Sequence, residues 1–205
     1  MTSFDENESF ELSDYDPGWA QRFEEESALL DVALGDDVID IKHVGSTSVP
    51  GLRAKPIIDI LVAVELFGDI ASYSERLAPL GYTHQQHIAD DERLFFWKGT
   101  PRTHHLHIVE YATWEHQRHI IFRDYLRKHP DIARRYTQIK EELASAFKND
   151  RPAYTRGKTA FIKAIMDRAV EEIIDPTIKQ LVAEAEKQAL AEHADNSSDD
   201  NSLIS

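Results

Sequence analysis

The chain has 205 residues, of which 41% are hydrophobic, and it carries a formal net charge of −14 at pH 7. It holds no cysteine, which excludes disulfides and thiolate metal sites. No apolar run approaches the about 18 residues that a membrane span needs, and the first residues lack the pattern of a signal peptide. These features predict a globular cytoplasmic protein without a membrane partner.

The charge is unevenly distributed along the chain. Residues 118–168 hold 13 Lys and Arg against 6 Asp and Glu, residues 1–117 hold 8 against 22, and residues 169–205 hold 2 against 9. A basic segment in an acidic chain attracts phosphate-bearing ligands, while the acidic ends repel polyanions. The distribution favours a phosphorylated small molecule over nucleic acid as partner; the alternative is a set of solvated helix faces. No feature of the sequence sets the oligomeric state.

The first half of the chain is expected to alternate helices and strands. Residues 1–15 are polar and acidic and are predicted to form a disordered tail. A helix opened by Asp16 and Pro17 is expected to run to about residue 35. Two strands should follow, over residues 38–44 and 57–64, and the loop that joins them covers residues 45–56. The second strand is almost wholly aliphatic, which is typical of a central strand.

The second half is predicted to contain a helix, a hairpin and then helices only. The first helix and the two hairpin strands are expected over residues 69–80, 94–98 and 104–111. Helices should follow over residues 114–128, 131–148 and 154–193, with Pro176 breaking or bending the last. The whole is an α+β fold, with a small mixed sheet and flanking helices, followed by a helical lobe. The expected parts are the core at 16–112, the lobe at 113–192 and a disordered acidic tail at 193–205.

The loop between the first two strands has the composition of a phosphate-binding turn. Gly45 and Ser46 follow the first strand directly, and Gly51 and Lys55 come within the next ten residues. Backbone N–H groups and a serine hydroxyl that are not crowded by Cβ atoms can hold a phosphate. The spacing is not that of a P-loop, so a kinase or ATPase of that type is excluded. The alternative is a tight turn with Lys55 in solvent.

Asp59 interrupts the apolar second strand, on the same face as Ile57 and Leu61. A carboxylate in such a strand is costly unless it is paired, hydrogen-bonded or bound to metal. A strand, a Gly-Ser loop and a second strand with a central aspartate suit nucleotidyl transfer, in which the loop holds a triphosphate and the carboxylate holds Mg²⁺. The alternative is a structural ion pair of Asp59 with Lys55 or Arg102.

The segment His43–Val64, HVGSTSVPGLRAKPIIDILVAV, resembles the signature of the GrpB family. The segments YDPGW, RTHHLHIVE, FRDYLRKHPDIARRYTQIK and YTRGKTAFI extend the resemblance over about residues 13–170. The resemblance implies a nucleotidyltransferase-like fold, and related domains are fused to dephospho-coenzyme A kinase in some bacteria. Nucleotidyltransferases usually carry two carboxylates as D-x-D on this strand, whereas Leu61 holds the second position here. A two-metal site therefore needs ligands other than this pair.

The same resemblance implies that the strand over residues 104–110 lies beside Asp59. His105 and His107 share one face of that strand and are the candidate metal ligands that would join Asp59. Imidazole suits Zn²⁺ or Mn²⁺ better than Mg²⁺. His107 alternatively acts as a general base near its ordinary pKa of about 6.5. The alternative for both is a half-buried, hydrogen-bonded histidine without a catalytic role.

Basic residues of the later segments are expected to close over a bound triphosphate and to neutralise charge as pyrophosphate leaves. The candidates are Arg102, Arg123, Lys140, Arg156 and Lys158. Arg156 and Lys158 are favoured, because a glycine separates them at the start of a helix. Arg123 and Lys140, taken singly, are more typical of solvated helix faces.

Three functions follow from these observations. The first is a nucleotidyltransferase that moves a nucleotide from an NTP to a small-molecule acceptor, with Asp59 and His107 as catalytic residues and Mg²⁺ or Mn²⁺ as cofactor. The second is a non-catalytic module that binds a nucleotide or another phosphorylated ligand, such as a coenzyme A precursor. The third is a hydrolase with Zn²⁺ or a similar metal at Asp59, His105 and His107. The expected phosphate-binding residues are Gly45, Ser46, Lys55, Arg102, Arg156 and Lys158.

Overall fold

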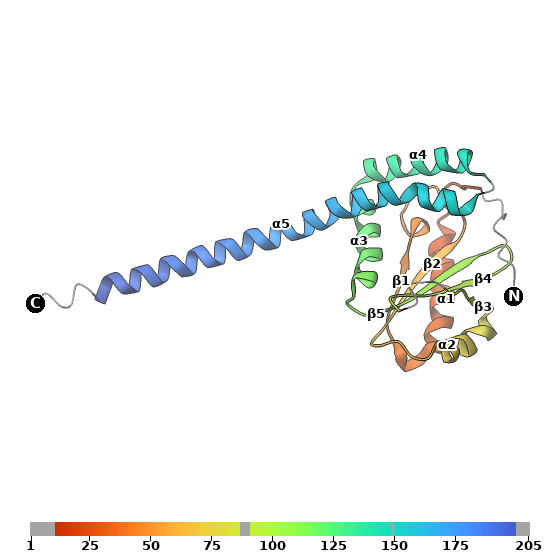
Figure 1. Ribbon diagram of the computed structural model, residues 1–205, viewed down its shortest axis with the longest axis horizontal. Coiled ribbons are helices and arrows are strands. Elements are labelled where there is room, and N and C mark those ends of the chain that lie inside the picture. Colours follow the sequence, from red (N-terminus) through yellow and green to blue (C-terminus); the bar gives the residue numbers. More distant parts are fainter. Residues whose placement is uncertain (1–10, 87–90, 149, 200–205) are drawn as a thin grey trace, which may run out of the picture. The chain divides into compact units, whose positions relative to one another are not determined.

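A mixed five-stranded sheet forms the centre of the unit that ends at Met166 (Figure 1). The computed structural model describes residues 11–86, 91–148 and 150–199. The strands lie in the order β1-β2-β5-β4-β3, and only β2 and β5 are parallel neighbours. Strands β1 to β5 are Val38–Val44, Ile58–Val64, Tyr82–His84, Leu94–Lys98 and His104–Glu110. The mixed α+β fold expected from the sequence is confirmed.

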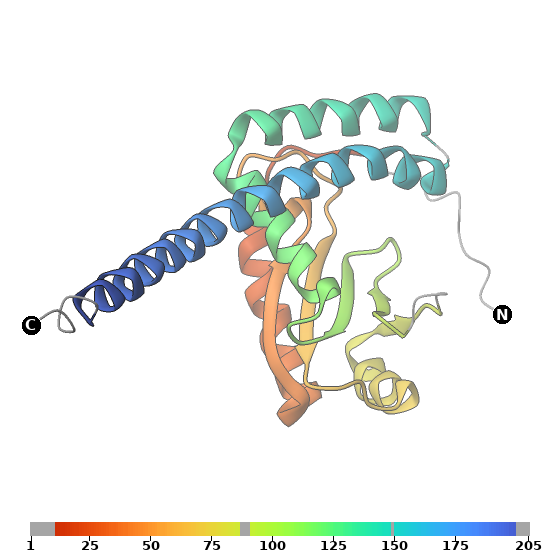
Figure 2. The same cartoon turned by 60° about the vertical axis from the view of Figure 1, so that its left-hand side comes forward.

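The central strand β2 is buried on both faces, which explains its nearly unbroken aliphatic sequence. On one face, Ile58, Ile60 and Val62 join the main core beneath α1 (Gly18–Leu34) and α2 (Ile70–Leu77). On the other face, Leu61 packs with Val44, Val109 and Ile120 beneath α3 (Trp114–Lys128). Asp59 shares this second face. Helices therefore cover both sides of the sheet (Figures 1 and 2).

Two further helices pack together beyond α3. They are α4 (Pro130–Ala146) and the first turns of α5 (Arg151–Asp199), which lie side by side (Figure 2). Tyr136 of α4 stacks on Phe161 of α5 with ring centroids 5.5 Å apart. Leu52 of the β1–β2 loop belongs to the same apolar cluster. This contact places the β1–β2 loop next to α4 and α5.

Several expected boundaries differ from the structure. The helix expected over residues 69–80 ends at Leu77 and continues as a 3₁₀ turn. The three-residue strand β3 was not expected, because it is too short to show an alternating pattern. Residues 11–15 are not a free tail, since Ser13 and Ala54 exchange two backbone hydrogen bonds of 2.9 and 3.0 Å. Residues 1–10 and 200–205 of the expected tails lie outside the described residues.

The C-terminal helix also differs from expectation. Helix α5 continues through Pro176 to Asp199, so Pro176 does not break it, although a break or a bend was expected, and residues 193–199, which were expected to be disordered, are helical. Pro176 removes one backbone donor, and strong helix formers stand about one turn away on either side, at Glu171 and Glu172 and at Lys179 to Leu181. The chain divides between Met166 and Asp167, within α5, and the expected parts at 16–112 and 113–192 stay predictions. None of the described helices is long and apolar enough to cross a membrane.

Candidate functional site

The loop after β1 begins with a glycine that no other residue can replace without strain. Gly45 has φ +69° and ψ −170°, in a region that side chains disfavour. A Cβ atom on Gly45 would lie 2.3 Å from Asp59 Oδ2. The loop backbone therefore lies directly against the carboxylate. The 3₁₀ turn Ser46–Ser48 follows, and the Ser48 hydroxyl closes it by donating to the Gly45 carbonyl at 2.6 Å.

The two histidines of β5 lie beside Asp59, as expected. The parallel register pairs Asp59 with His105 and Leu61 with His107, so all three polar side chains project from one face. His105 Nδ1 lies 2.9 Å from Asp59 Oδ1, and His107 Nε2 lies 3.9 Å from the same oxygen. A carboxylate only accepts, so His105 carries its proton on Nδ1. Burial raises the pKa of Asp59, but the hydrogen bond from His105 and the closeness of His107 outweigh it and lower that pKa.

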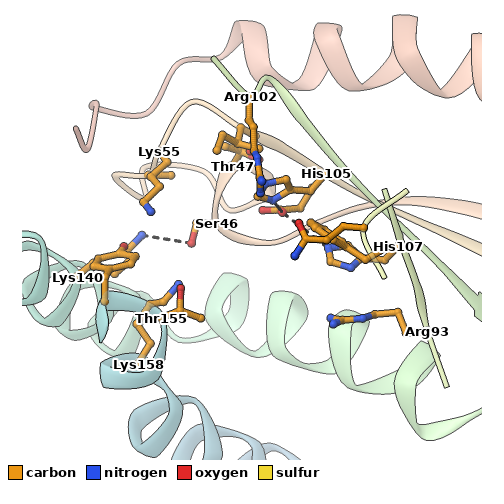
Figure 3. Close-up of a pocket in the computed structure, with 16 residues that line it drawn as sticks. Ser46, Thr47, Lys55, Arg93, Arg102, His105, His107, Lys140, Thr155 and Lys158 are labelled. Atoms are coloured by element: carbon orange, nitrogen blue, oxygen red, sulfur yellow. Dashed lines mark hydrogen bonds and ion pairs between the residues drawn. The ribbon is translucent and has the colours of Figure 1, made fainter. Parts of the chain in front are cut away.

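These groups line a cavity of about 430 Å³ (Figure 3). It is walled by the β1–β2 loop, by β2, β4 and β5, and by α4 and the first turns of α5. Eight of the candidate residues meet in it: Ser46, Lys55, Asp59, Arg102, His105, His107, Lys140 and Lys158. Asp59 is the single carboxylate among the described residues that line it. The roles of these residues remain predictions.

Two predicted site residues lie elsewhere. Arg156 is exposed and does not line the cavity, because residues two apart lie on nearly opposite sides of an α-helix, and Lys158 faces inward. Arg123 is also outside the cavity, and its guanidinium donates to the His43 carbonyl at 3.0 Å. The glycine between Arg156 and Lys158 was therefore not a guide to which of them faces the cavity.

The cavity contains residues that the sequence reasoning missed or discounted. Tyr154 lies between two cations, with Lys55 Nζ 4.3 Å and Lys158 Nζ 4.6 Å from its ring centroid. The spacing of Tyr154 and Lys158, i and i+4 on a helix, was the available signal. Arg93 precedes β4 and had no distinguishing sequence signal. Thr155 also lines the wall.

Lys140 is buried, not solvated, with 2% of its surface exposed. Its ammonium donates to Ser46 Oγ at 3.3 Å and to the Arg53 carbonyl. Burial and the neighbouring Lys158 lower the pKa of Lys140 to about 7. Ala133, Tyr136 and Lys140 follow at i, i+3 and i+7, a spacing that predicts one buried helix face and that would have identified this lysine.

Comparison with known proteins confirms the family expected from the sequence. The model of the GrpB protein family matches residues 9–168. The chain belongs to the GrpB family. A UPF0157 protein of Pseudomonas aeruginosa is 39% identical to it over 188 residues, which cover 89% of this chain and 77% of the relative. The glutamate-rich protein GrpB of Alkalihalophilus pseudofirmus is 38% identical over 162 residues, which cover 76% and 93%.

A solved structure supports the fold of this GrpB-family chain. The crystal structure of conserved protein GrpB from Enterococcus faecalis is 37% identical, with a TM-score of 0.74. The match covers 80% of this chain and 99% of the bacterial protein. A more distant relative, 26% identical over 181 residues, is a dephospho-CoA kinase of Mycolicibacterium paratuberculosis, and the match spans 44% of its length. Membership of the nucleotidyltransferase superfamily stays a prediction.

The side chains around Asp59 bear on which metal this GrpB-family site could hold. Within residues 11–86, 91–148 and 150–199, no group of three or more His, Asp or Glu side chains is arranged to hold a metal ion. Asp59 Oδ1 already accepts from His105, and the remaining oxygen lies against Gly45. One carboxylate suits a single Mg²⁺ that a ligand's phosphates also bind, and does not suit a two-metal site.

Buried histidines should make this GrpB-family chain sensitive to acid. Burial lowers the pKa values of His43 and His107 to about 4 from an ordinary value of 6.5. The unfolded chain therefore binds more protons between pH 6.5 and 4, so stability is lost as the pH falls through this window. Each histidine contributes roughly 1–3 kcal/mol. Urea unfolding at pH 7.5 and 5.5 should show a lower midpoint at pH 5.5.

The contribution of one histidine to this acid sensitivity can be measured by substitution. His43 stacks on Phe23 at 4.9 Å and lies 3.0 Å from Thr47 Oγ1, so His43→Gln keeps a polar partner for Thr47 but cannot be protonated. The difference between the two midpoints should shrink in His43→Gln and not in His129→Gln, where the histidine is only half-buried. An equal pH response of all three proteins would contradict this explanation.

Proposed function

We propose that the cavity binds a phosphorylated small molecule of nucleotide size. The observation that carries this proposal is the charge of the wall. Of the residues that the structure describes, five cationic side chains and one carboxylate, that of Asp59, line it; the cations are Lys55, Arg93, Arg102, Lys140 and Lys158. The chain as a whole carries −14, so this concentration of positive charge does not follow from the overall composition. A cleft of one charge sign concentrates ligands of the opposite sign.

The size and polarity of the wall agree with a nucleotide-like ligand. A volume of about 430 Å³ lies within the range of small-molecule sites, which is roughly 300–1,000 Å³. Hydroxyls of Ser46, Thr47 and Thr155 add donors beside the cations. Phe95 gives the wall an apolar surface, as most ligand sites have. The name of the distant mycobacterial relative makes dephospho-CoA a ligand to test beside ATP.

The test is titration calorimetry of the full chain with ATP, dephospho-CoA and adenosine, each with and without MgCl₂. We expect a phosphorylated compound to bind with a Kd in about the micromolar range, which corresponds to about −8 kcal/mol. Adenosine should bind at least about tenfold more weakly, because it gives the five cations no counter-charge. Equal or undetectable binding of all three compounds would contradict the proposal.

A second candidate function is nucleotidyl transfer, which one observation favours. The Gly45–Ser46 loop lies directly against Asp59, with 2.3 Å between Asp59 Oδ2 and the position of a Cβ on Gly45. A ligand phosphate held by this loop is therefore next to the carboxylate. Asp59 would hold one Mg²⁺ together with the phosphates, and a bound Mg²⁺ stabilises charge that develops on phosphate oxygens. His105, oriented by Asp59, would accept the proton of an acceptor hydroxyl.

Asp59→Asn separates the two functions. For nucleotidyl transfer we expect the substitution to remove the Mg²⁺-dependent part of ATP affinity, about tenfold, and to stop pyrophosphate release. For binding alone, affinity should stay the same or rise, because a negative charge leaves the cavity. Calorimetry with and without MgCl₂ and a pyrophosphate assay measure both. An unchanged Mg²⁺ response in Asp59→Asn would remove the support for nucleotidyl transfer.

The third function, a histidine-centred metal hydrolase, gains no support from the geometry. His105 Nδ1 donates a hydrogen bond to Asp59 Oδ1, so these two groups are not arranged around a common ion. His107 Nδ1 is buried without a hydrogen-bond partner among the described residues. Elemental analysis of the purified protein for Zn²⁺ and Mn²⁺ tests this function, and a stoichiometric content of either metal would restore it.

A further inference from the structure

One cation of the cavity wall is almost wholly buried and lacks a counter-charge. Lys140 is 2% exposed, and among the described residues its ammonium contacts neutral groups alone: Ser46 Oγ at 3.3 Å, the Arg53 carbonyl, and the Tyr136 ring with its centroid at 4.9 Å. Burying an ammonium is costly unless an anion compensates it. Lys140 therefore costs stability in the unliganded fold, which is unusual unless the residue serves a ligand.

The charged neighbours of Lys140 do not supply that counter-charge. Lys158 on α5 and Arg53 in the β1–β2 loop both repel the ammonium and lower its pKa. Glu141, the next residue on α4, raises the pKa less than burial lowers it, and its carboxylate is paired with Arg53. Burial raises the pKa of Tyr136 well above its ordinary value, so it stays neutral. The net result is the pKa of about 7 for Lys140.

The position of Lys140 indicates which group could accept its third hydrogen bond. An ammonium has three N–H donors, and the described residues supply two hydrogen-bond acceptors to this one. Figure 3 shows Lys140 at one end of the cavity with Ser46, Lys55, Thr155 and Lys158. The third donor is therefore available to an acceptor in the cavity. Phosphate oxygens are the strongest such acceptors for a cationic donor.

The inference that follows rests on the proposed binding function. We propose that Lys140 is a specificity-determining residue that takes up a proton when the terminal phosphate of a di- or triphosphate chain binds at this end of the cavity. Lys55, Lys140 and Lys158 together carry up to three positive charges, whereas one phosphate group carries about −1.5 to −2 at pH 7. A longer phosphate chain matches all three lysines and a single phosphate leaves one of them uncompensated.

The inference is tested on the full chain by titration calorimetry with inorganic triphosphate and with orthophosphate, which have no base or sugar. The wild type should bind triphosphate at least about tenfold more tightly than orthophosphate. Lys140→Met should bind triphosphate at least about tenfold more weakly than the wild type does, and should therefore lose this preference. At pH 8.5, the wild type should take up more protons on binding triphosphate than Lys140→Met does, measured from the dependence of the heat on buffer ionisation enthalpy.

Two controls separate this role from a purely structural one. Lys140→Met should keep or raise the Tm, because it removes a buried charge of similar volume. Lys163→Met changes an exposed lysine of α5 outside the cavity and should match the wild type in every measurement. Lys140→Arg keeps its charge at all these pH values, so it should take up no more protons on binding triphosphate than Lys140→Met does.

Failure of the role of Lys140 and failure of the proposed binding function give different results in these measurements. If Lys140→Met keeps the wild-type preference and proton uptake, the role of Lys140 is overturned. If the wild type binds ATP but prefers neither inorganic probe, the inference about the phosphate chain is overturned and the proposed binding function stands. If the wild type binds neither ATP, dephospho-CoA nor triphosphate, the proposed function itself fails.

Discussion

Gly45→Ala is expected to abolish ligand binding and to lower the Tm by roughly 10 °C. A Cβ at this position would lie 2.3 Å from Asp59 Oδ2 and 2.8 Å from Asp59 Cβ, so either the loop or β2 must move. The positive φ of +69° adds about 1–2 kcal/mol of backbone strain. The clash raises the total to roughly 3–4 kcal/mol, and each kcal/mol lowers the Tm by about 2–4 °C in a chain of this size.

A matched control is available in the same loop. Gly51 has φ +77°, close to that of Gly45, but a Cβ there meets no atom within 4 Å. Gly51→Ala should therefore show only the backbone strain, a fall in Tm of roughly 3–5 °C, and should bind ATP like the wild type. Thermal unfolding and calorimetry of both variants measure the difference. Equal losses in the two variants would show that the contact between Gly45 and Asp59 has no special importance.

Lys158→Ala is expected to weaken ATP binding by about 10- to 100-fold with little change in Tm. The lysine is held 4.6 Å from the centre of the Tyr154 ring and lines the cavity. Loss of one hydrogen bond between charged partners costs about 1.5–3 kcal/mol, which gives this range of affinity. Because Tyr154 also lies 4.3 Å from Lys55 Nζ, the ring should keep its place after the substitution.

Arg156→Ala is the control for Lys158→Ala. It removes the same charge from the same helix, two residues away, but from an exposed side chain outside the cavity. Only the general electrostatic contribution should be lost, which changes the affinity for ATP by less than about twofold at physiological salt. If Arg156→Ala weakens binding as much as Lys158→Ala, long-range charge and not the cavity determines the affinity.

Most of the fold was predictable because its signals are local. The aliphatic run of β2 identified the central strand, and Gly99 with Pro101 marked the turn of the β4–β5 hairpin. Pro176 was predicted to break or bend the last helix, but α5 continues through it, with strong helix formers about one turn away on either side. The division within α5 depends on contacts between distant segments, which local patterns do not show.

The candidate site was predictable where one loop or one strand pair determines it. Ser46, Lys55 and Asp59 follow one another closely in sequence, and family resemblance placed His105 and His107 beside them. The cations of α4 and α5 were harder, since their inward or outward direction depends on helix rotation. An α-helix turns by about 100° per residue, so the cavity-lining Lys158 and the exposed Arg156, two positions apart, lie on nearly opposite sides of α5. Arg93 is brought to the cavity by the pairing of β4 with β5, which the sequence around it does not indicate.

The most direct test of the binding function is a crystal structure of the full chain grown with ATP and MgCl₂. We predict that the phosphate chain lies in the cavity, with its oxygens at about 2.7–3.2 Å from the ammonium groups of Lys55, Lys140 and Lys158. A nucleotide bound elsewhere on the chain, or one whose phosphates point away from these three lysines, would contradict the account.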